Sequence, residues 1–130
     1  MATKQRKIPA PDANPETKPF WDAAAEGKLL IKTCRACGQT HYYPRALCPF
    51  CLSDQTEWTV AKGTGTIYSY SVMRRAEVPY AIAYVTLDEG PSMMTNVVQC
   101  DFDTLKIGQR VKIAFTPTEG GPPVPTFTTA

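Results

Sequence analysis

Four cysteines arranged as two C-x2-C pairs carry the clearest chemical signal in this 130-residue chain. Cys34 and Cys37 form the first pair, Cys48 and Cys51 form the second, and ten residues separate them. Two such turns supply four thiolates, the soft ligands that tetrahedral zinc prefers. Gly38 follows the first pair, where such a turn often needs a positive φ. The gap is shorter than the roughly 15–20 residues of the usual zinc pattern, but it suffices for a hairpin that returns the second pair to the first.

The surrounding sequence disfavours other roles for these four cysteines. Two disulfides would require an oxidising compartment, and a redox C-x2-C is expected beside a βαβ pattern that is not visible here. Iron–sulfur clusters usually have other spacings. We therefore expect one structural zinc ion, with iron as the alternative metal, in a closed site that leaves no open coordination position. His41 lies between the pairs and is expected to be a bystander rather than a ligand.

The remaining polar residues do not suggest a catalytic set. Because His41 is the only histidine, Ser–His–Asp or Cys–His catalysis would have to use a residue held between the metal-binding turns. Cys100 precedes an aspartate and is expected to be structural, as free cysteines are usually buried. Two acidic pairs fall in expected turns, where Asp commonly bonds to the backbone: Asp88 with Glu89, and Asp101 with Asp103. No glycine-rich nucleotide fingerprint is present.

Arg74, Arg75 and Tyr80 form a weaker candidate binding site. Two adjacent arginines in a loop at the mouth of a barrel can grip phosphate or carboxylate groups bidentately. Tyr80 follows a proline at the same end and can stack on an adenine ring. The alternatives are that the arginines are solvated loop charges and that Tyr80 is a core aromatic.

The N-terminal part of the chain must position the cysteine pairs. Residues 1–16 contain three prolines and are expected to form an irregular arm. Residues 17–26 predict a short helix with Thr17 as N-cap and Gly27 as its C-terminal stop. Its apolar face carries Phe20 and Trp21, which must pack against the chain's own body or against another subunit, because so short a helix is marginal alone.

Short strands account for the rest of the chain, which is expected to be mainly β. Residues 28–33, 39–43 and 56–61 predict the three strands of a rubredoxin-like zinc ribbon, so residues 17–62 form the helix and ribbon. Two glycines in residues 62–65 mark the boundary. Residues 63–130 predict a small five-stranded barrel of the OB type with a Pro-rich tail. Its expected strands are 66–73, 80–87, 92–98, 110–116 and 124–128. In the first of them, strict alternation places Ile67, Ser69, Ser71 and Met73 on one face and Tyr68, Tyr70 and Val72 on the other.

The charge and hydropathy of the chain argue against nucleic-acid and membrane partners. The chain has a net charge of +2, but residues 66–130 carry five basic and six acidic residues. A nucleic-acid-binding domain should carry a basic stripe on its binding module, so the charge of the barrel argues against nucleic acid. No run approaches the 18 apolar residues of a membrane span, and no apolar run follows the basic N-terminus as in a secretory signal. We expect a cytoplasmic protein without membrane attachment.

In combination, several motifs make the chain resemble the zinc-ribbon plus OB-fold proteins first described as domain of unknown function 35. The resemblance spans residues 17–128. Its motifs are Lys-Pro-Phe-Trp-Asp from residue 18, Gly-Lys-Leu-Leu-Ile from residue 27, the paired C-x2-C with Pro44 and Arg45 between them, Gly-Thr-Gly-Thr-Ile-Tyr-Ser-Tyr from residue 63, Pro79-Tyr80, Leu-Lys-Ile-Gly from residue 105, and the Pro-x-Phe tail at 125–127.

The resemblance implies a role as a partner subunit. Members of this family typically accompany thiolase-like proteins that act on coenzyme A thioesters, and the thiolase-fold subunit holds the chemistry. The resemblance therefore implies a non-catalytic accessory subunit of a thiolase-like or aldolase complex, in a hetero-oligomer, that bridges, stabilises or helps to bind acyl-CoA. In that setting Arg74, Arg75 and Tyr80 are the candidate acyl-CoA contacts. A single-stranded nucleic-acid-binding module is the alternative function, because OB barrels and zinc ribbons both serve it.

Overall fold

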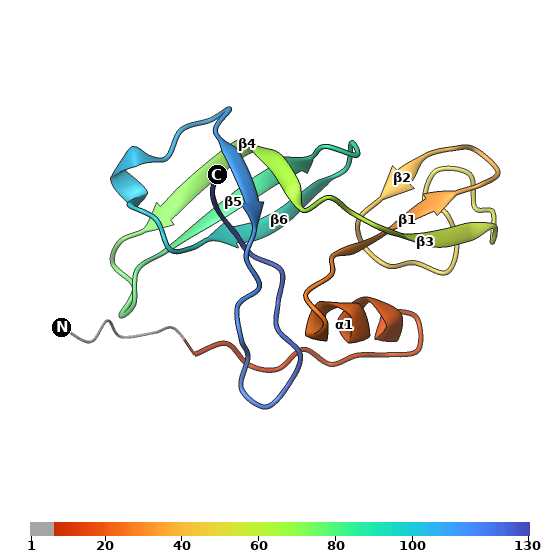
Figure 1. Cartoon of the computed structure of the whole chain (residues 1–130), viewed down its shortest axis with the longest axis horizontal. Coiled ribbons are helices and arrows are strands. Elements are labelled where there is room, and N and C mark those ends of the chain that lie inside the picture. Colours follow the sequence, from red (N-terminus) through yellow and green to blue (C-terminus); the bar gives the residue numbers. More distant parts are fainter. Residues whose placement is uncertain (1–6) are drawn as a thin grey trace.

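The chain folds into a small zinc-ribbon sheet and a closed β-barrel, with one helix beneath them (Figure 1). The structure is a computed structural model and describes residues 7–130; the first six residues of the expected arm lie outside the described part. The helix α1 spans Lys18–Ala25, and the ribbon strands are β1 (Leu30–Cys34), β2 (Thr40–His41) and β3 (Thr56–Val60). The barrel contains β4 (Thr64–Met73), β5 (Tyr80–Leu87), β6 (Ser92–Val97), the 3-10 helix η1 (Phe102–Thr104), β7 (Arg110–Ile113) and β8 (Phe127–Thr129). The expected mainly-β fold class is confirmed.

The ribbon is a three-stranded antiparallel sheet in the order β2-β1-β3. β1 pairs along its whole length with β3, from Leu30 opposite Val60 to Cys34 opposite Thr56. Leu29, directly before β1, and Ile31, within β1, are buried. Both belong to the hydrophobic core that continues into the barrel. The sheet therefore carries Cys34 at the end of a strand that is fixed on both sides.

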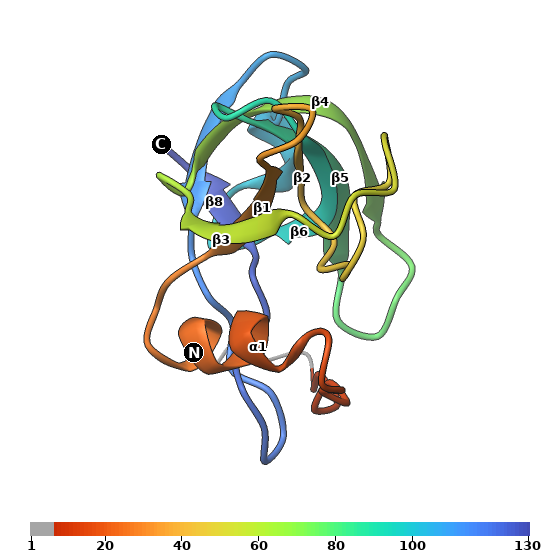
Figure 2. The same ribbon diagram turned by 90° about the vertical axis from the view of Figure 1, so that its right-hand side faces the viewer.

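The barrel closes in the order β4-β5-β6-β8-β7. Closure depends on β7, which pairs antiparallel with both β4 and β8. Small and branched residues fill the interior, with Ala81, Ala83 and Val85 of β5 each at most 1% exposed. Phe127 of β8 is the largest fully buried side chain. Viewed from the side, the barrel strands curve behind the ribbon and the helix lies below both (Figure 2).

A β-bulge in β4 changes the side-chain alternation that the sequence predicts. The register along β5 shifts between Ile67 and Ser69, which leaves Tyr68 as the extra residue. Ile67 then pairs with Val85, and Tyr70 pairs with Ala83, so both lie on the face that points into the barrel. The prediction that Ile67 and Tyr70 occupy opposite faces is wrong, because an inserted residue moves all later residues to the other side.

The helix α1 packs against the chain's own body. Phe20 is 3% exposed and makes edge-to-face contacts with Trp21 and Tyr42, at centroid distances of 4.9 and 5.7 Å. Gly27 ends the helix with a φ of +81°, as expected. Phe20 is therefore a core residue of the described fold, and only Trp21 of this pair lies at its edge.

The start of α1 differs from the expected N-cap. Thr17 occupies the N-cap position, but its side chain caps no backbone N–H of the helix. Its hydroxyl instead accepts a bond from the backbone N–H of Asn14, and the Asn14 side chain accepts one from the Thr17 N–H. The reason is local backbone geometry: Thr17 has helical φ and ψ of −104° and −8° rather than the extended conformation that a capping side chain needs.

Candidate metal centre

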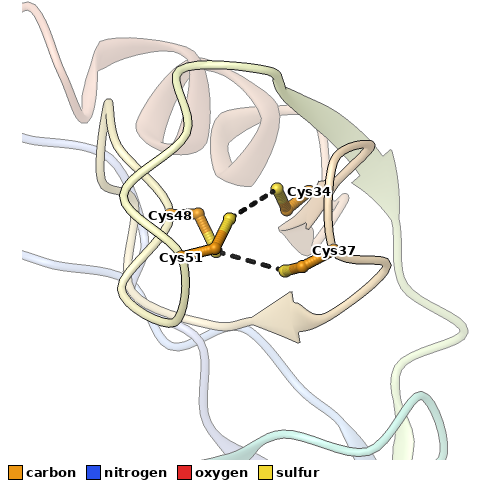
Figure 3. Close-up of side chains that lie close together, drawn as sticks. All are labelled: Cys34, Cys37, Cys48 and Cys51. Atoms are coloured by element: carbon orange, nitrogen blue, oxygen red, sulfur yellow. Dashed lines mark hydrogen bonds between the residues drawn. The ribbon is translucent and has the colours of Figure 1, made fainter.

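The four cysteine thiols converge between the two turns of the ribbon (Figure 3). The Sγ atoms of Cys34 and Cys51 are 3.6 Å apart, those of Cys37 and Cys48 are 3.7 Å apart, and all four lie within 4.8 Å of one another. A disulfide has an S–S length of about 2.0 Å, so these are four free thiols. Sulfurs bound tetrahedrally at a Zn–S distance of about 2.3 Å lie about 3.8 Å apart. The donor set and its spacing therefore suit one zinc ion, and the expected zinc site is confirmed.

The two cysteine turns have the same backbone hydrogen bonds. The Gly38 N–H donates to the Cys34 carbonyl at 2.8 Å, and the Leu52 N–H donates to the Cys48 carbonyl at 2.9 Å. Both closing residues have positive φ, +78° for Gly38 and +65° for Leu52. The sequence signals the first turn through its glycine, whereas nothing in a leucine signals a left-handed residue. A metal that holds both cysteines of the second turn would offset the strain at Leu52.

Backbone N–H groups also prepare one thiol for metal binding. The N–H of Cys37 is the main cause of a pKa of about 7 for Cys34, which is lower than that of an ordinary thiol. The thiolate is the form that binds metal, so this N–H favours the ligand state of Cys34. For the Cys51 thiol in the same cluster, the hydrogen bond from the Ser53 backbone is outweighed by burial and the other three thiols, which together raise its pKa to about 12. Within each pair the first cysteine is buried and the second is exposed, so the site opens to solvent on the side of Cys37 and Cys51.

His41 does not belong to this cluster of metal-binding groups. It is 6% exposed in β2, and neither ring nitrogen has a hydrogen-bond partner within residues 7–130. Burial is the main reason that its pKa is lowered, and the positive charges of Lys32 and Arg45 add to the effect. His41 is thus a neutral, inaccessible ring at neutral pH, which does not suit a catalytic base.

The structure brings the candidate phosphate-binding residues to one end of the β4–β5 hairpin. Met73, the last residue of β4, pairs with Tyr80, the first residue of β5, and the two arginines follow Met73 directly. Arg74 forms an ion pair with Asp103 at 2.7 Å. Within residues 7–130, Arg75 is exposed and has no ion pair.

The other singled-out residues have structural roles. Cys100 is half-buried against the barrel core, and burial followed by the charge of Asp101 raises the pKa of its thiol. The Asp101 side chain accepts a bond from the Asp103 N–H and begins η1. These observations agree with the expectation of a structural cysteine and of local bonding by Asp101. The carboxylates of Asp103 and Asp88 instead pair with arginines distant in sequence, Arg74 and Arg110, which the turn positions alone did not indicate.

Two family models together match most of the chain. Residues 21–57 match the rubredoxin-like zinc ribbon domain of ChsH2, and residues 58–116 match the C-terminal OB-fold domain of ChsH2. The boundary between the two matches lies within β3, a few residues before the glycines at which the barrel begins. No helix of residues 7–130 has the length and apolar character needed to cross a membrane.

Individual proteins show the same similarity. A DUF35 domain-containing scaffold protein of Methanothermobacter thermautotrophicus is 34% identical over 67% of this chain and 71% of its own length. A probable enoyl-CoA hydratase alpha subunit of Thermomonospora curvata is 32% identical over 92% of this chain, which spans only 39% of that relative. Among solved structures, a chain of the Ltp2-ChsH2(DUF35) aldolase matches with a TM-score of 0.79 and 31% identity, covering 92% of this chain and 98% of that one.

Proposed function

Because the chain belongs to the DUF35 family of ChsH2-like zinc-ribbon and OB-fold proteins, we propose that it is a non-catalytic accessory subunit of a complex that acts on acyl-CoA thioesters. The partner is a thiolase-fold subunit with thiolase or aldolase activity. In this complex the chain bridges or stabilises the catalytic subunit and helps to hold the acyl-CoA.

One observation carries the proposal. The chain matches the subunit in the Ltp2-ChsH2(DUF35) aldolase over nearly the full length of both, with both modules in place. The T. curvata relative is a subunit by name, and the enzyme class in that name also acts on coenzyme A thioesters. The match covers 39% of that relative, so the proposal takes from it only the substrate class and the subunit role.

The chemistry of the described residues supports a non-catalytic role. Four cysteines fill the coordination sphere of a tetrahedral zinc ion and leave no position for substrate. The single histidine is buried with its ring nitrogens inaccessible, and the fifth cysteine has a raised pKa, which lowers the fraction of nucleophilic thiolate. The zinc ion, held by Cys34, Cys37, Cys48 and Cys51, therefore supplies folding free energy to a module too small to fold on its own core.

A coenzyme A contact at the β4–β5 turn is part of the proposal. Arg75 presents an exposed guanidinium that can bind phosphate bidentately. Arg74 is held beside it by Asp103 at 2.7 Å, and Tyr80 provides an aromatic ring at the same end of the hairpin. This arrangement fits the phosphates and the adenine of coenzyme A.

Affinity purification from the native cells tests the proposed function. The tagged chain is recovered at moderate ionic strength, and co-purifying proteins are identified and quantified by mass spectrometry. We expect a thiolase-fold protein in near-equal molar amount. A tagged Cys48→Ser chain, in which the ribbon is expected to unfold, serves as the control. Proteins that bind only to exposed apolar surface should be recovered more strongly on this variant than on the unaltered chain. Recovery of no acyl-CoA-acting enzyme on the unaltered chain would contradict the proposal.

A further inference from the structure

Three neighbouring barrel strands present an exposed row of large side chains. Tyr68 lies at the β4 bulge beside Ser69, which pairs with Tyr84 of β5, and Tyr84 pairs with Met94 of β6. These three side chains are 70%, 48% and 63% exposed. They therefore form a continuous row across the outer face of β4-β5-β6, which we call the barrel row.

The three strands that carry the barrel row contain no charged residue. β4, β5 and β6 are 10, 8 and 6 residues long, and none of these residues is Lys, Arg, Asp or Glu. Charged residues make up 20% of the chain as a whole. The solvated face of an antiparallel sheet is normally polar, and the polar residues that these strands expose are all uncharged. The guanidinium of Arg110 reaches this face from the neighbouring β7, where it donates to the Thr66 hydroxyl at 3.1 Å.

A groove extends the apolar surface beyond the row. It has a volume of about 420 Å³ and is lined by Met94 and Ile82 of the barrel, Trp21 of α1 and Tyr42 of the ribbon. None of its lining residues is charged. Because Met94 belongs to both, the barrel row and the groove form one surface to which the helix, the ribbon and the barrel all contribute.

The composition of this surface fits the centre of a protein interface. Its two tyrosines alone expose roughly 240 Å², taking about 200 Å² for a whole aromatic side chain. Met94 and the groove increase this area, which approaches the roughly 300–600 Å² of the largest apolar patch on a typical monomer. Tyr and Met are enriched and Lys, Glu and Asp are depleted at the centre of protein interfaces.

We propose that the barrel row and its groove are the surface on which the thiolase-fold partner subunit docks, through an uncharged apolar face of that partner. This inference rests on the proposed function and adds the location and the chemistry of the contact. Strands two and three of an OB barrel, here β5 and β6, are the face that binds oligonucleotides in other proteins. Neither β5 nor β6 carries a cation that could bind phosphate, and Arg74 and Arg75 lie in the loop at one end of this hairpin, which is why we assign a protein partner to the strands themselves.

The test compares two sets of substitutions in binding to the purified partner. The row variant carries Tyr68→Ser, Tyr84→Ser and Met94→Ser. The control variant carries Val60→Ser and Ile107→Ser, which remove side chains that are 63% and 70% exposed but lie outside the surface. Zinc content and thermal unfolding establish that both variants fold. If the row variant does not fold, the single variant Met94→Lys replaces it in the comparison. This substitution places a charge at a position that is solvated in the free chain.

We expect the row variant to bind at least about 100-fold more weakly, because it removes two tyrosines and a methionine, and truncating a tyrosine that acts as an interface hot spot weakens binding by roughly 30-fold or more. Met94→Lys should weaken binding at least tenfold, and the control should match the unaltered chain. Binding of the unaltered chain should change little from low to high ionic strength, as expected for an apolar contact.

Several results would overturn the assignment. If the row variant binds the partner as tightly as the unaltered chain, docking occurs elsewhere while the accessory-subunit function stands. If the unaltered chain binds no thiolase-fold subunit, both proposals fail. If the unaltered chain dimerises in analytical ultracentrifugation and the row variant does not, the surface belongs to a second copy. If a labelled oligothymidine binds the unaltered chain and not the row variant, it is a nucleic-acid platform.

Discussion

The guanidinium of Arg110 holds both carboxylate oxygens of Asp88, with Nη1 2.7 Å from Oδ1 and Nη2 2.9 Å from Oδ2. Arg110 begins β7, and Asp88 follows the last residue of β5. The hydroxyl of Thr64 at the start of β4 donates to the same carboxylate. Beside it, the backbone N–H of Lys62 donates to Glu89 at 2.7 Å. The pair therefore joins three strands at the rim where the chain passes from ribbon to barrel.

Acid should weaken this rim through Asp88. Hydrogen bonds from Arg110 and then Thr64 hold the pKa of the Asp88 carboxyl well below its usual range. A carboxyl with a lowered folded-state pKa contributes stability that is present above its unfolded pKa of about 3.9 and is lost as the pH falls below it. The melting temperature of the unaltered chain should exceed that of Asp88→Asn at neutral pH, and the difference should shrink below about pH 4.

Thermal unfolding of both proteins across this pH range measures the effect. Asp54→Asn is the control, because Asp54 has no ion pair within residues 7–130, and it should track the unaltered chain at every pH. A difference between the unaltered chain and Asp88→Asn that stays constant from neutral to acid pH would show that the carboxylate does not stabilise the rim.

Zinc content should depend on all four cysteines of the cluster and not on the fifth. We expect one zinc ion per chain by elemental mass spectrometry. Cys48→Ser should abolish stoichiometric zinc and unfold the ribbon, because the metal supplies much of the free energy that a small ribbon needs. Cys100→Ser removes a thiol outside the cluster and should leave zinc unchanged. Full zinc occupancy in Cys48→Ser, or iron in place of zinc in the unaltered chain, would contradict the assignment.

A substitution at Gly65 should destabilise the barrel. A Cβ atom at this position would lie 2.6 Å from the Thr86 carbonyl oxygen and 2.8 Å from a Val85 methyl carbon. Because the nearest atom is backbone, β5 would have to move, and Gly65→Ala should lower the free energy of unfolding by about 1–3 kcal/mol. Ser71→Ala on the same strand is exposed and should have an effect of at most about 0.5 kcal/mol. Chemical denaturation measures both, and equal stabilities would refute the close approach.

Local patterns predicted the elements of this fold well. The strand expected at 80–87 matches β5 at both ends, and the cysteine spacing located the metal site. In the sequence Gly65 only marks the boundary between ribbon and barrel, whereas its main constraint is the close approach of β5, a contact between segments distant in sequence. The bulge at Tyr68 and the ion pair between Arg74 and Asp103 in η1 were not predicted for the same reason. Both depend on contacts between distant segments, which the local periodicity of the sequence does not encode. From the sequence alone, Phe20 could pack either on the chain itself or on another subunit. The structure shows that it packs in the chain's own core.

Coenzyme A binding should depend on Arg75 more than on Arg74. Arg75 has no ion pair in the described part of the chain, whereas Arg74 already pairs with Asp103. A charge-assisted hydrogen bond contributes about 1.5–3 kcal/mol, so Arg75→Ala should weaken binding by about 10–100-fold and Arg74→Ala by less. Calorimetric titration of the assembled complex with coenzyme A measures this. Unchanged affinity in Arg75→Ala would remove the β4–β5 turn from the acyl-CoA site.

The most direct test of the central claim is acyl-CoA turnover by the purified components, separately and together. An accessory role predicts no turnover by this chain alone and a higher rate or a longer active lifetime of the thiolase-fold subunit when the chain is added. It also predicts that Cys100→Ser supports the complex as well as the unaltered chain does. Turnover by this chain alone, lost in Cys100→Ser, would contradict the account and identify the chain as an enzyme in its own right.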